Sequence, residues 1–378
     1  MRAKELTWSP SAGWTGDQSG KDAVDLVLYF GARRALADRS RFTELRALFP
    51  SAHVLGCSTG GQIHNDDVVD EEIAAIAIRF DTTKLKLACR SVDGVDASSR
   101  CGVAIGHALE GDGLAGIFVL SDGLVVNGSE LVAGITSVVG HDIPLTGGLA
   151  GDGAEFGETL VGADDAPHPH RVAAIGFYGP AIRIGHGSAG GWDVFGPRRR
   201  ITKSMGNLLL ELDGEPALDL YERYLGEEAQ NLPGSALLFP LQISNPHHPD
   251  INIVRTVLAV DRKKRTMTFA GDMPEGWTAQ LMRGNFDRLC GGAADAARQA
   301  QSGIGDGDSV AILVSCIGRR LLMGQRITDE IEAAGAVLGK KTLRLGFYSY
   351  GEISPHAASG TCELHNQTMT VTAFHEAA

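Results

Sequence analysis

The run DLVLYFG at residues 25–31 decides the fold, because a continuous apolar run that ends at a glycine is typical of a strand buried on both faces. Residues 41–49 follow with helical periodicity, and AHVLGCSTGG at residues 52–61 indicates a second strand that ends in a glycine turn. A strand, a helix and a strand in this order predict a β-α-β crossover, in which the two strands are parallel neighbours.

A second copy of this order begins with the run LAGIFVL at residues 114–120. A helix is predicted to follow as far as Val139, and either Asn127 or Ser129 has the side-chain oxygen that can cap its first turn. The run IPLTGGLAGDG at residues 143–153 closes the copy as a strand that again ends among glycines.

A third copy runs from SVAILVS at residues 309–315, through a predicted helix over 323–338, to LRLGFYSYGE at 343–352. Copies this divergent arise by chance as well as by duplication, so the pattern predicts the elements and leaves their origin open. The fold class that it predicts is α/β, with repeated β-α-β units and mixed sheets. We expect two related halves packed around a central ligand pocket.

Stretches rich in predicted β-strands separate the copies, and a break in the pattern divides the chain. Pro197 and the basic run Arg198–Arg200 mark the best boundary, and we interpret the basic run as a solvated connection. The predicted parts are a flexible N-terminal arm over residues 1–21 and two domains, over 22–197 and 198–373.

The composition excludes several classes of protein. The chain has 378 residues, of which 43% are hydrophobic and 21% charged, as in ordinary globular proteins. A net charge of −12 disfavours a nucleic-acid partner. We find no secretory signal, no apolar stretch long enough to span a membrane, and no C-x-x-C pair among the six cysteines. These features predict a cytoplasmic protein without a membrane partner, and they leave its oligomeric state open.

Motifs for phosphate and metal binding are weak. The chain has no P-loop, and the glycines at 148–153 lack dinucleotide-binding spacing. Cys362 and His365 have C-x-x-H spacing, but the two side chains need not share a strand face. We therefore interpret the histidines of the polar loops as solvated and predict no metal site.

The strongest candidate site is the set of strand ends. Glycines and small polar residues cluster where the second strand of each copy ends, and open α/β sheets bind ligands beyond the carboxyl ends of their strands. The alternative is that these glycines only make tight turns. The candidate ligand-binding residues are Cys57, Ser58, Thr59, Gly60, Gly148, Gly151, Asp152, Arg319, Tyr348, Tyr350 and Glu352.

Charged and thiol side chains add detail to this hypothesis. Arg319 follows an apolar strand, where its guanidinium could clamp an anion. Glu352 could hold an amine or pair with Arg319. A thiol-dependent enzyme that uses Cys57 or Cys316 is an alternative, although a buried structural thiol fits an apolar strand better.

Six stretches in order resemble the FIST family, and the resemblance covers roughly residues 22–373. The resemblance identifies the two predicted domains as the FIST N-terminal and C-terminal domains. It implies a sensory module that binds a small ligand, with no enzymatic activity. The stretches are GCSTGGQI at 56–63, TGGLAGD at 146–152, FAGDMPEG at 269–276, SCIGRR at 315–320, GFYSYGEI at 346–353 and HNQTMTV at 365–371.

The resemblance also implies signalling partners and a cofactor. Standalone bacterial members report their ligand to a separate histidine kinase or diguanylate cyclase, and those of the NosP type bind haem and sense nitric oxide. A haem would need an axial histidine, for which the candidates are His356, His247, His248 and His186. The alternative ligand is an amino acid or another small metabolite, bound without haem.

Overall fold

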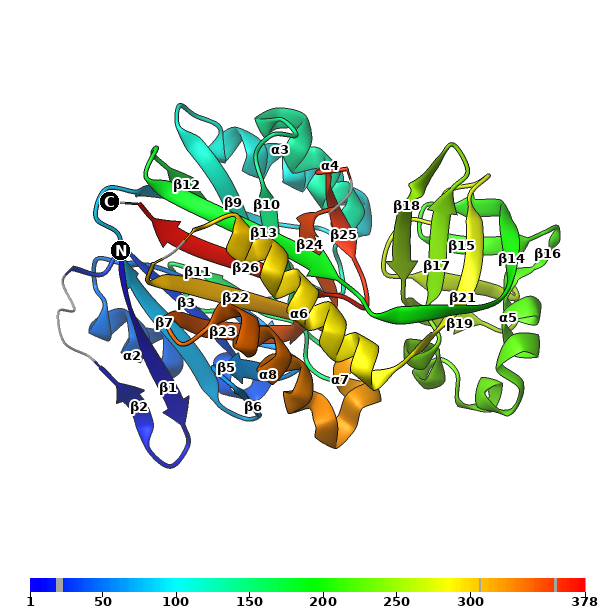
Figure 1. Cartoon of the computed structure of the whole chain (residues 1–378), viewed down its shortest axis with the longest axis horizontal. Coiled ribbons are helices and arrows are strands. Elements are labelled where there is room, and N and C mark those ends of the chain that lie inside the picture. The colour runs from blue at the N-terminus through cyan, green and yellow to red at the C-terminus, as the bar shows by residue number, and fades with distance from the viewer. Residues whose placement is uncertain (18–22, 306, 357–358, 378) are drawn as a thin grey trace.

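The computed structural model describes residues 1–17, 23–305, 307–356 and 359–377. The chain forms two parts, which lie side by side in Figure 1. The larger part, the three-unit body, contains the three copies of strand, helix and strand. The smaller part, the inserted unit, is a β-rich segment over residues 192–284 at the right of Figure 1. The body is therefore built from sequence on both sides of the insertion.

Each copy folds as a parallel strand pair, as predicted, and the three pairs have matching registers. One glycine in each second strand allows a close approach, because a Cβ there would lie 2.2 Å or less from a carbonyl oxygen of the first strand. These glycines are Gly56, Gly147 and Gly346. The elements are β3 (Leu26–Ala32), α1 (Arg33–Ala37), α2 (Ser40–Leu48) and β4 (His53–Thr59) in unit one; β9 (Leu114–Ser121), α4 (Gly128–Val139) and β10 (Leu145–Leu149) in unit two; and β22 (Ser309–Cys316), α7 (Ile317–Met323), η5 (Gly324–Arg326), α8 (Ile327–Leu338) and β23 (Thr342–Ser349) in unit three.

Three mixed sheets of six strands form the body, and each combines strands from two units. Unit one extends its pair with a strand of unit two, unit two with a strand of unit three, and unit three with a strand of unit one. The sheets therefore close a threefold cycle. Their orders are β11-β4-β3-β7-β1-β2, β25-β24-β10-β9-β12-β8 and β13-β26-β22-β23-β5-β6. The further strands are β1 (Arg2–Ser9), β2 (Gly13–Gly16), β5 (Gln62–His64), β6 (Asp67–Val69), β7 (Ile73–Arg79), β8 (Lys84–Ser91), β11 (Val161–Ala163), β12 (Arg171–Tyr178), β13 (Ile182–Ala189), β24 (Gly351–Pro355), β25 (Cys362–His365) and β26 (Met369–Glu376).

The carboxyl ends of the three parallel pairs meet at the centre of the body, where backbone hydrogen bonds join them in a ring. In each unit, the amide that donates lies four residues beyond the close-approach glycine, and the carbonyl that accepts lies two residues beyond the same glycine. The bonds run from the Gly60 amide to the Tyr348 carbonyl (2.8 Å), from Gly151 to Ser58 (3.0 Å) and from Tyr350 to Leu149 (3.1 Å). Main chain thus fills the centre itself, and any ligand must bind beside it.

Aromatic side chains from different units fill the space between the sheets. Phe30 packs against Phe347 with ring centroids 4.5 Å apart, and Phe177 packs against Phe374 at 4.8 Å. All four rings are fully buried. This shared core explains why no single unit could bury its own apolar face alone.

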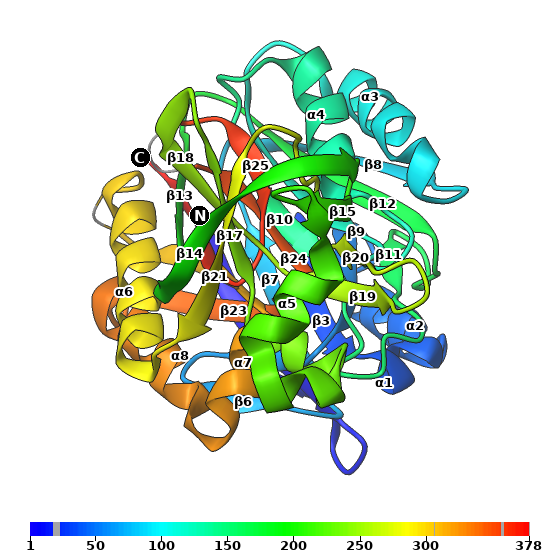
Figure 2. The same ribbon diagram turned by 90° about the vertical axis from the view of Figure 1, so that its right-hand side faces the viewer.

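Helices cover the outer faces of the sheets, and Figure 2 shows them around the edge of the molecule. η2 (Val95–Ala97) leads into α3 (Ser98–Leu109), which packs on α4, and α6 (Phe286–Ser302) packs on α8. Asn127 caps α4 as predicted, since its side chain accepts hydrogen bonds from the amides of Ser129 (3.0 Å) and Glu130 (3.3 Å).

The inserted unit is a second, antiparallel sheet with its own apolar core, which includes Ile201, Tyr221 and Phe269. Its strand order is β18-β17-β21-β14-β15-β20-β19, with β16 beside β15. The elements are β14 (Trp192–Met205), β15 (Leu208–Leu212), β16 (Glu215–Pro216), α5 (Ala217–Leu225), η3 (Gly226–Asn231), η4 (Gly234–Leu238), β17 (Leu241–Asn245), β18 (His248–Arg255), β19 (Val257–Asp261), β20 (Thr266–Phe269) and β21 (Thr278–Gly284).

The structure differs from the sequence prediction at the two expected boundaries. The N-terminal residues are not a loose arm, because β1 pairs with β7 along its whole length and β2 pairs with β1; residues 18–21 of that arm lie outside the described residues. Pro197 lies inside β14, at a shift of register that accommodates its missing amide. The body consequently draws strands from both predicted domains, and three units take the place of the two expected halves.

Candidate functional site

Several predicted strand-end residues gather beside the central ring, where they line a polar cavity of about 240 Å³. Thr59 and Gly60 come from the end of β4, and Asp152 from the loop after β10. Arginines at the start of α1 and on α7 complete the wall. We call this group the strand-end cluster; its members are Arg33, Arg34, Thr59, Gly60, Asp70, Asp152, Glu155, Arg320 and Tyr350.

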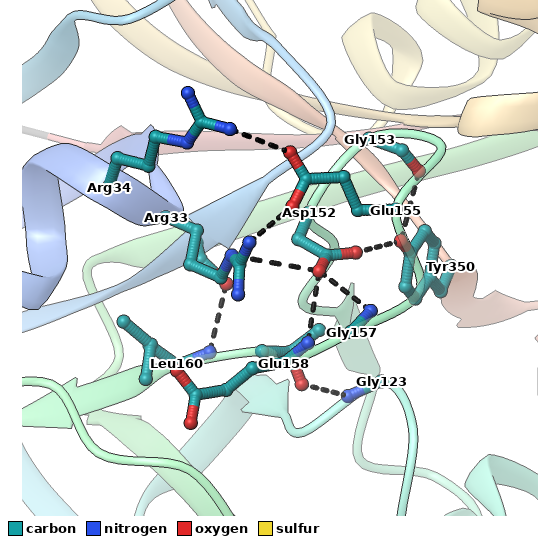
Figure 3. A network of polar contacts seen from close by, with 12 residues as sticks. Arg33, Arg34, Gly123, Asp152, Gly153, Glu155, Gly157, Glu158, Leu160 and Tyr350 are labelled. Carbon is teal, nitrogen blue, oxygen red and sulfur yellow. Dashed lines mark hydrogen bonds and ion pairs between the residues drawn. The ribbon is translucent and has the colours of Figure 1, made fainter.

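Asp152 is the best-bonded carboxylate of the strand-end cluster (Figure 3). It accepts hydrogen bonds from the backbone amides of residues 157–158 (2.9 and 3.0 Å) and from the Tyr350 hydroxyl. Burial by itself would raise the pKa of Asp152, but these hydrogen bonds hold it below its ordinary value. Arg33 approaches Asp152 to 3.7 Å and also pairs with Glu155.

The remaining charges of the strand-end cluster are matched in the same way. Arg34 pairs with Glu155 at 3.4 Å. Arg320 pairs with Asp70 at 2.7 Å and also donates a hydrogen bond to the Gly60 carbonyl. The ionised groups of the cluster therefore neutralise one another, and they hold the loop after β10 against β4 and α1.

The other predicted residues near the ring are buried in the body. The Ser58 hydroxyl accepts a hydrogen bond from the Leu160 amide (2.8 Å), and a Cβ on Gly148 would meet the side chain of Val314. Burial raises the pKa of the Cys57 thiol well above its ordinary value, and it raises the pKa of Cys316 as well. Burial therefore disfavours the thiolate form of both cysteines, which is the form that a thiol-dependent enzyme requires.

Arg319 is fully buried, and its partners are internal to the protein. Its guanidinium forms an ion pair with Glu330 (2.7 Å) and donates to the carbonyls of Gly190 and Leu289 (2.9 Å to the latter). Gly190 precedes β14, and Leu289 follows β21, so one side chain joins both connections of the inserted unit. Arg319, which we expected to bind an anionic ligand, therefore binds Glu330 and main-chain carbonyls instead.

Glu352 and Tyr348 are likewise buried and bonded. Glu352 accepts hydrogen bonds from the Ser349 hydroxyl (2.6 Å) and from the amide and hydroxyl of Thr368 (3.2 and 3.0 Å). Burial raises the pKa of Glu352 to about 8. The Tyr348 hydroxyl donates to Glu330 (3.0 Å). Glu352 does not form the expected pair with Arg319, because Glu330 occupies that guanidinium.

The four histidines considered for haem lie at separate places. His247 and His248 are exposed at the turn between β17 and β18, His186 is on β13, and His356 stacks on His365 with ring centroids 6.0 Å apart. None of the four lines either cavity described here. Haem ligation needs a histidine in the wall of an apolar cavity, so haem binding through one of these four side chains stays a prediction. The described residues also contain no group of three or more His, Cys, Asp or Glu side chains suited to a metal ion.

A second cavity, of about 270 Å³, lies between the three-unit body and the inserted unit. We call it the interface pocket. On the body side it is lined by α4 and β25, and on the other side by β17, β18 and the segment 272–277; Figure 1 shows β25 facing β18. Apolar side chains form much of its wall, among them Val132, Ile243, Ile253 and Trp277.

Polar groups in the interface pocket lack the partners that those of the strand-end cluster have. Arg255, which is 5% exposed, forms no ion pair with the described residues. The Ser129 hydroxyl and the Glu363 Oε2 are buried without a hydrogen-bond partner. Buried polar groups are nearly always bonded, so unmet groups around one cavity indicate a place for a ligand.

Sequence reasoning missed the interface pocket, because its walls come from three distant segments of the chain. One signal was available, namely Arg255 within the otherwise apolar stretch INIVRTVLAV at residues 251–260. A charge in such a stretch needs a buried partner. The strand pattern alone, however, could not predict that β25 and α4 face it.

Models of two domain families match almost the whole chain. The FIST N domain matches residues 25–215, and the FIST C domain matches residues 217–355. The chain belongs to the FIST family. FIST domains are in general sensory domains that bind small ligands. In this FIST protein the division between the two models falls inside the inserted unit, between β16 and α5.

Two known proteins are similar to this FIST protein. An uncharacterized protein of Methanocaldococcus jannaschii is 23% identical over an alignment of 355 residues, which covers 82% of this chain and 66% of that protein. The chain thus spans just under two thirds of the length of that relative. The crystal structure of a cyanuric acid hydrolase from A. caulinodans aligns over 100% of this chain and 99% of that one, with 8% identity and a TM-score of 0.37. A likeness at that level carries no argument.

One further property concerns membranes. No helix in the described part of this FIST protein is both long enough and apolar enough to cross a bilayer.

Proposed function

We propose that this FIST protein is a sensor that binds a small metabolite in the interface pocket and reports it to a separate signalling partner. The observation that carries the proposal is a set of polar groups around that pocket: the Ser129 hydroxyl and the Glu363 Oε2 are buried without a hydrogen-bond partner, and Arg255 has no ion-pair partner among the described residues. Ligand pockets commonly lie between two parts of a protein and combine apolar walls with a few polar groups.

The position of the interface pocket suggests how binding could become a signal. A ligand there touches α4 and β25 on one side and β17 and β18 on the other. It therefore stabilises one arrangement of the inserted unit relative to the body over others, which is what a ligand-driven change requires. A partner that contacts both parts, such as a histidine kinase or a diguanylate cyclase, would sense that arrangement.

The ligand in this proposal is an amino acid or another small metabolite. A volume of about 270 Å³ lies just below the roughly 300–1,000 Å³ of drug-sized sites, which favours a small ligand. Haem with nitric oxide sensing is the competing proposal, which rests on the family resemblance and needs a histidine arrangement other than the one described. An absorption spectrum separates the two, since a Soret band after expression with haem supply supports the haem form.

The experiment that tests the proposal blocks the interface pocket with a bulky side chain. Ala133 on α4 lines the pocket and is exposed, so Ala133→Trp fills it without disturbing the core. Ser137→Trp, one turn further along the same exposed face, is the matched control. Small molecules extracted from each purified protein are compared by mass spectrometry, and thermal shifts are measured with a panel of metabolites.

We expect a metabolite that binds the native chain and Ser137→Trp, and that Ala133→Trp fails to bind. Equal binding by Ala133→Trp and Ser137→Trp would rule out the interface pocket as the sensory site.

A further inference from the structure

The interface pocket contains a buried positive charge that forms no ion pair with the described residues, although the carboxylates of Asp272 and Glu363 lie further away in the same wall. The Arg255 guanidinium donates through Nε to the Asp272 carbonyl and through Nη1 to the Leu364 carbonyl, both at 3.0 Å. Both acceptors are backbone carbonyls, which carry no net charge. Among the described residues, no carboxylate oxygen lies within 4.0 Å of Arg255, and no hydrogen bond uses its Nη2. An isolated buried charge is costly, and proteins usually pair it.

Burial also disfavours the charged form of the Arg255 guanidinium. Burial lowers the pKa of Arg255 to about 10, while the more distant charges of Glu363 and Asp272 act in the opposite direction. An anion bound against the guanidinium would oppose the effect of burial.

Two further groups define the polar end of the pocket. A Cβ on Gly271 would lie 2.9 Å from the Arg255 guanidinium carbon and 3.2 Å from the Ser129 hydroxyl. The Arg255 guanidinium on β18 and the Ser129 hydroxyl on α4 therefore lie next to the same point, one on each side of the pocket. Glu363, whose Oε2 has no partner, lines the same cavity and can accept a hydrogen bond from a ligand.

Charge limits the class of anion that this arrangement fits. One guanidinium matches the charge of one carboxylate, to which the unused Nη2 can donate a charge-assisted hydrogen bond. A phosphate dianion would bring a second negative charge toward Glu363 and Asp272, where His141 is the only other basic side chain among the described residues of the wall. The apolar side chains of Ile243, Ile253 and Trp277 leave room for a short hydrocarbon body.

We propose that the ligand of the interface pocket is a small monocarboxylate, whose carboxylate binds Arg255 and Ser129 and whose hydrogen-bond donor, next to the carboxylate, binds Glu363. This inference rests on the proposed function and names the ligand class of the same site. Arg255 is then the residue that selects for the acid over its neutral analogues.

The test uses matched pairs of ligands on the full chain. Carboxylates of two to six carbons, with and without a 2-hydroxyl or 2-amino group, are titrated beside their own amides and beside inorganic phosphate. Dissociation constants come from calorimetry and thermal shifts. We expect at least one acid to bind about 10- to 100-fold more tightly than its amide, the size expected for a charge-assisted hydrogen-bond pair. Phosphate should not compete.

Variants assign the selectivity to Arg255. Arg255→Met should weaken the binding of that acid about 10- to 100-fold and leave the affinity for its amide unchanged. A merely structural role of Arg255 would not produce this difference. Arg262→Met, at an exposed arginine of the same inserted unit, is the control and should bind as the native chain does. Circular dichroism and denaturant unfolding establish that both variants are folded.

The outcomes separate the inference from the proposed function. If no acid binds better than its amide, or if Arg255→Met retains the preference for the acid, the carboxylate inference is wrong. A neutral metabolite whose binding Ala133→Trp blocks would leave the sensory pocket intact while overturning the ligand class. Binding of a carboxylate that Ala133→Trp does not affect would overturn both, since the acid would then bind elsewhere.

Discussion

Two buried arginines, Arg319 and Arg255, have opposite surroundings. Arg319 has a carboxylate partner in Glu330 and carbonyl acceptors at both connections of the inserted unit. Arg255 has carbonyl acceptors but no carboxylate, and it faces the interface pocket. The sequence draws attention to Arg319, which follows an obvious strand. Arg319, which has an internal carboxylate partner, joins main-chain segments, and Arg255, which has none among the described residues, is the arginine that we propose for the ligand.

The same contrast holds for the two cavities. In the strand-end cluster every carboxylate has an arginine, an amide or a hydroxyl beside it, as Asp152 illustrates. In the interface pocket Ser129 and Glu363 have buried oxygen atoms without partners. This difference in unmet hydrogen-bonding capacity is why we propose the interface pocket, and not the strand-end cluster, as the ligand site.

The largest expected effect breaks the ion pair of Arg319. Arg319→Met leaves Glu330 buried and without its cation, so we expect the free energy of unfolding to fall by about 3–5 kcal/mol. Denaturant unfolding measures it. Arg319→Lys keeps the charge but loses the forked geometry, so its free energy of unfolding should lie between those of Arg319→Met and the native chain. A loss below about 1 kcal/mol in Arg319→Met would mean that the pair is not structural.

Arg255→Met is the matched comparison for that variant. Removing an unpaired buried charge offsets the loss of two hydrogen bonds of about 1 kcal/mol each. We therefore expect a change of less than about 1 kcal/mol in the ligand-free protein, together with loss of acid binding. Equal destabilisation by the Arg319 and Arg255 variants would remove the distinction between the two regions.

The next effect concerns Glu352, which lies near the strand ends with a pKa raised to about 8. A carboxyl group with a raised pKa in the folded state favours folding while it is protonated, and that stability is lost as the pH rises from about 4.5 to about 8. Glu352→Gln cannot ionise. We expect it to remove a slope of up to about 1.4 kcal/mol per pH unit between pH 5 and 7.

The measurement for Glu352 is denaturant unfolding of both proteins at pH 5, 6, 7 and 8. The variant should match the native chain at pH 5 and exceed it at pH 8. Parallel curves across this range would show that Glu352 does not titrate there.

The smallest expected effect is at the rim of the strand-end cluster. Glu155 is about half exposed, and it pairs with Arg33 and Arg34. Glu155→Ala should lower the free energy of unfolding by less than about 1 kcal/mol, because exposed ion pairs contribute little. Ligand binding, measured by thermal shift with the acid that binds the native chain, should be unchanged. Loss of binding would place the ligand in the strand-end cluster instead.

Local patterns in the sequence predicted the repeated elements well. The apolar runs at residues 25–31, 114–120 and 309–315 fold as the first strands of parallel pairs, and Asn127 caps its helix. These features depend on neighbours in the chain, since strand runs and caps are defined by local spacing. The repeat therefore shows plainly in the sequence.

The arrangement of the units could not be predicted in the same way. The exchange of strands between units depends on pairs distant in sequence, such as Gly346 with Ile63 and Gly148 with Glu352. Likewise, the pairing of Arg319 with Glu330 rather than Glu352 is decided by the packing of α8 against the sheet. The interface pocket needs segments more than 100 residues apart, so no local pattern describes it.

Because Arg319 binds both Gly190 and Leu289, the polypeptide leaves the body and re-enters it at neighbouring points. Segments whose ends lie close together can be exchanged with little cost in loop-closure entropy, and domain insertions are tolerated at such positions. The inserted unit thus has the geometry of a domain insertion, with both of its ends at one place on the body. A body from which it is excised, with a short linker in its place, should retain its threefold cycle of sheets and lose the interface pocket, because the inserted unit supplies the wall that carries Arg255.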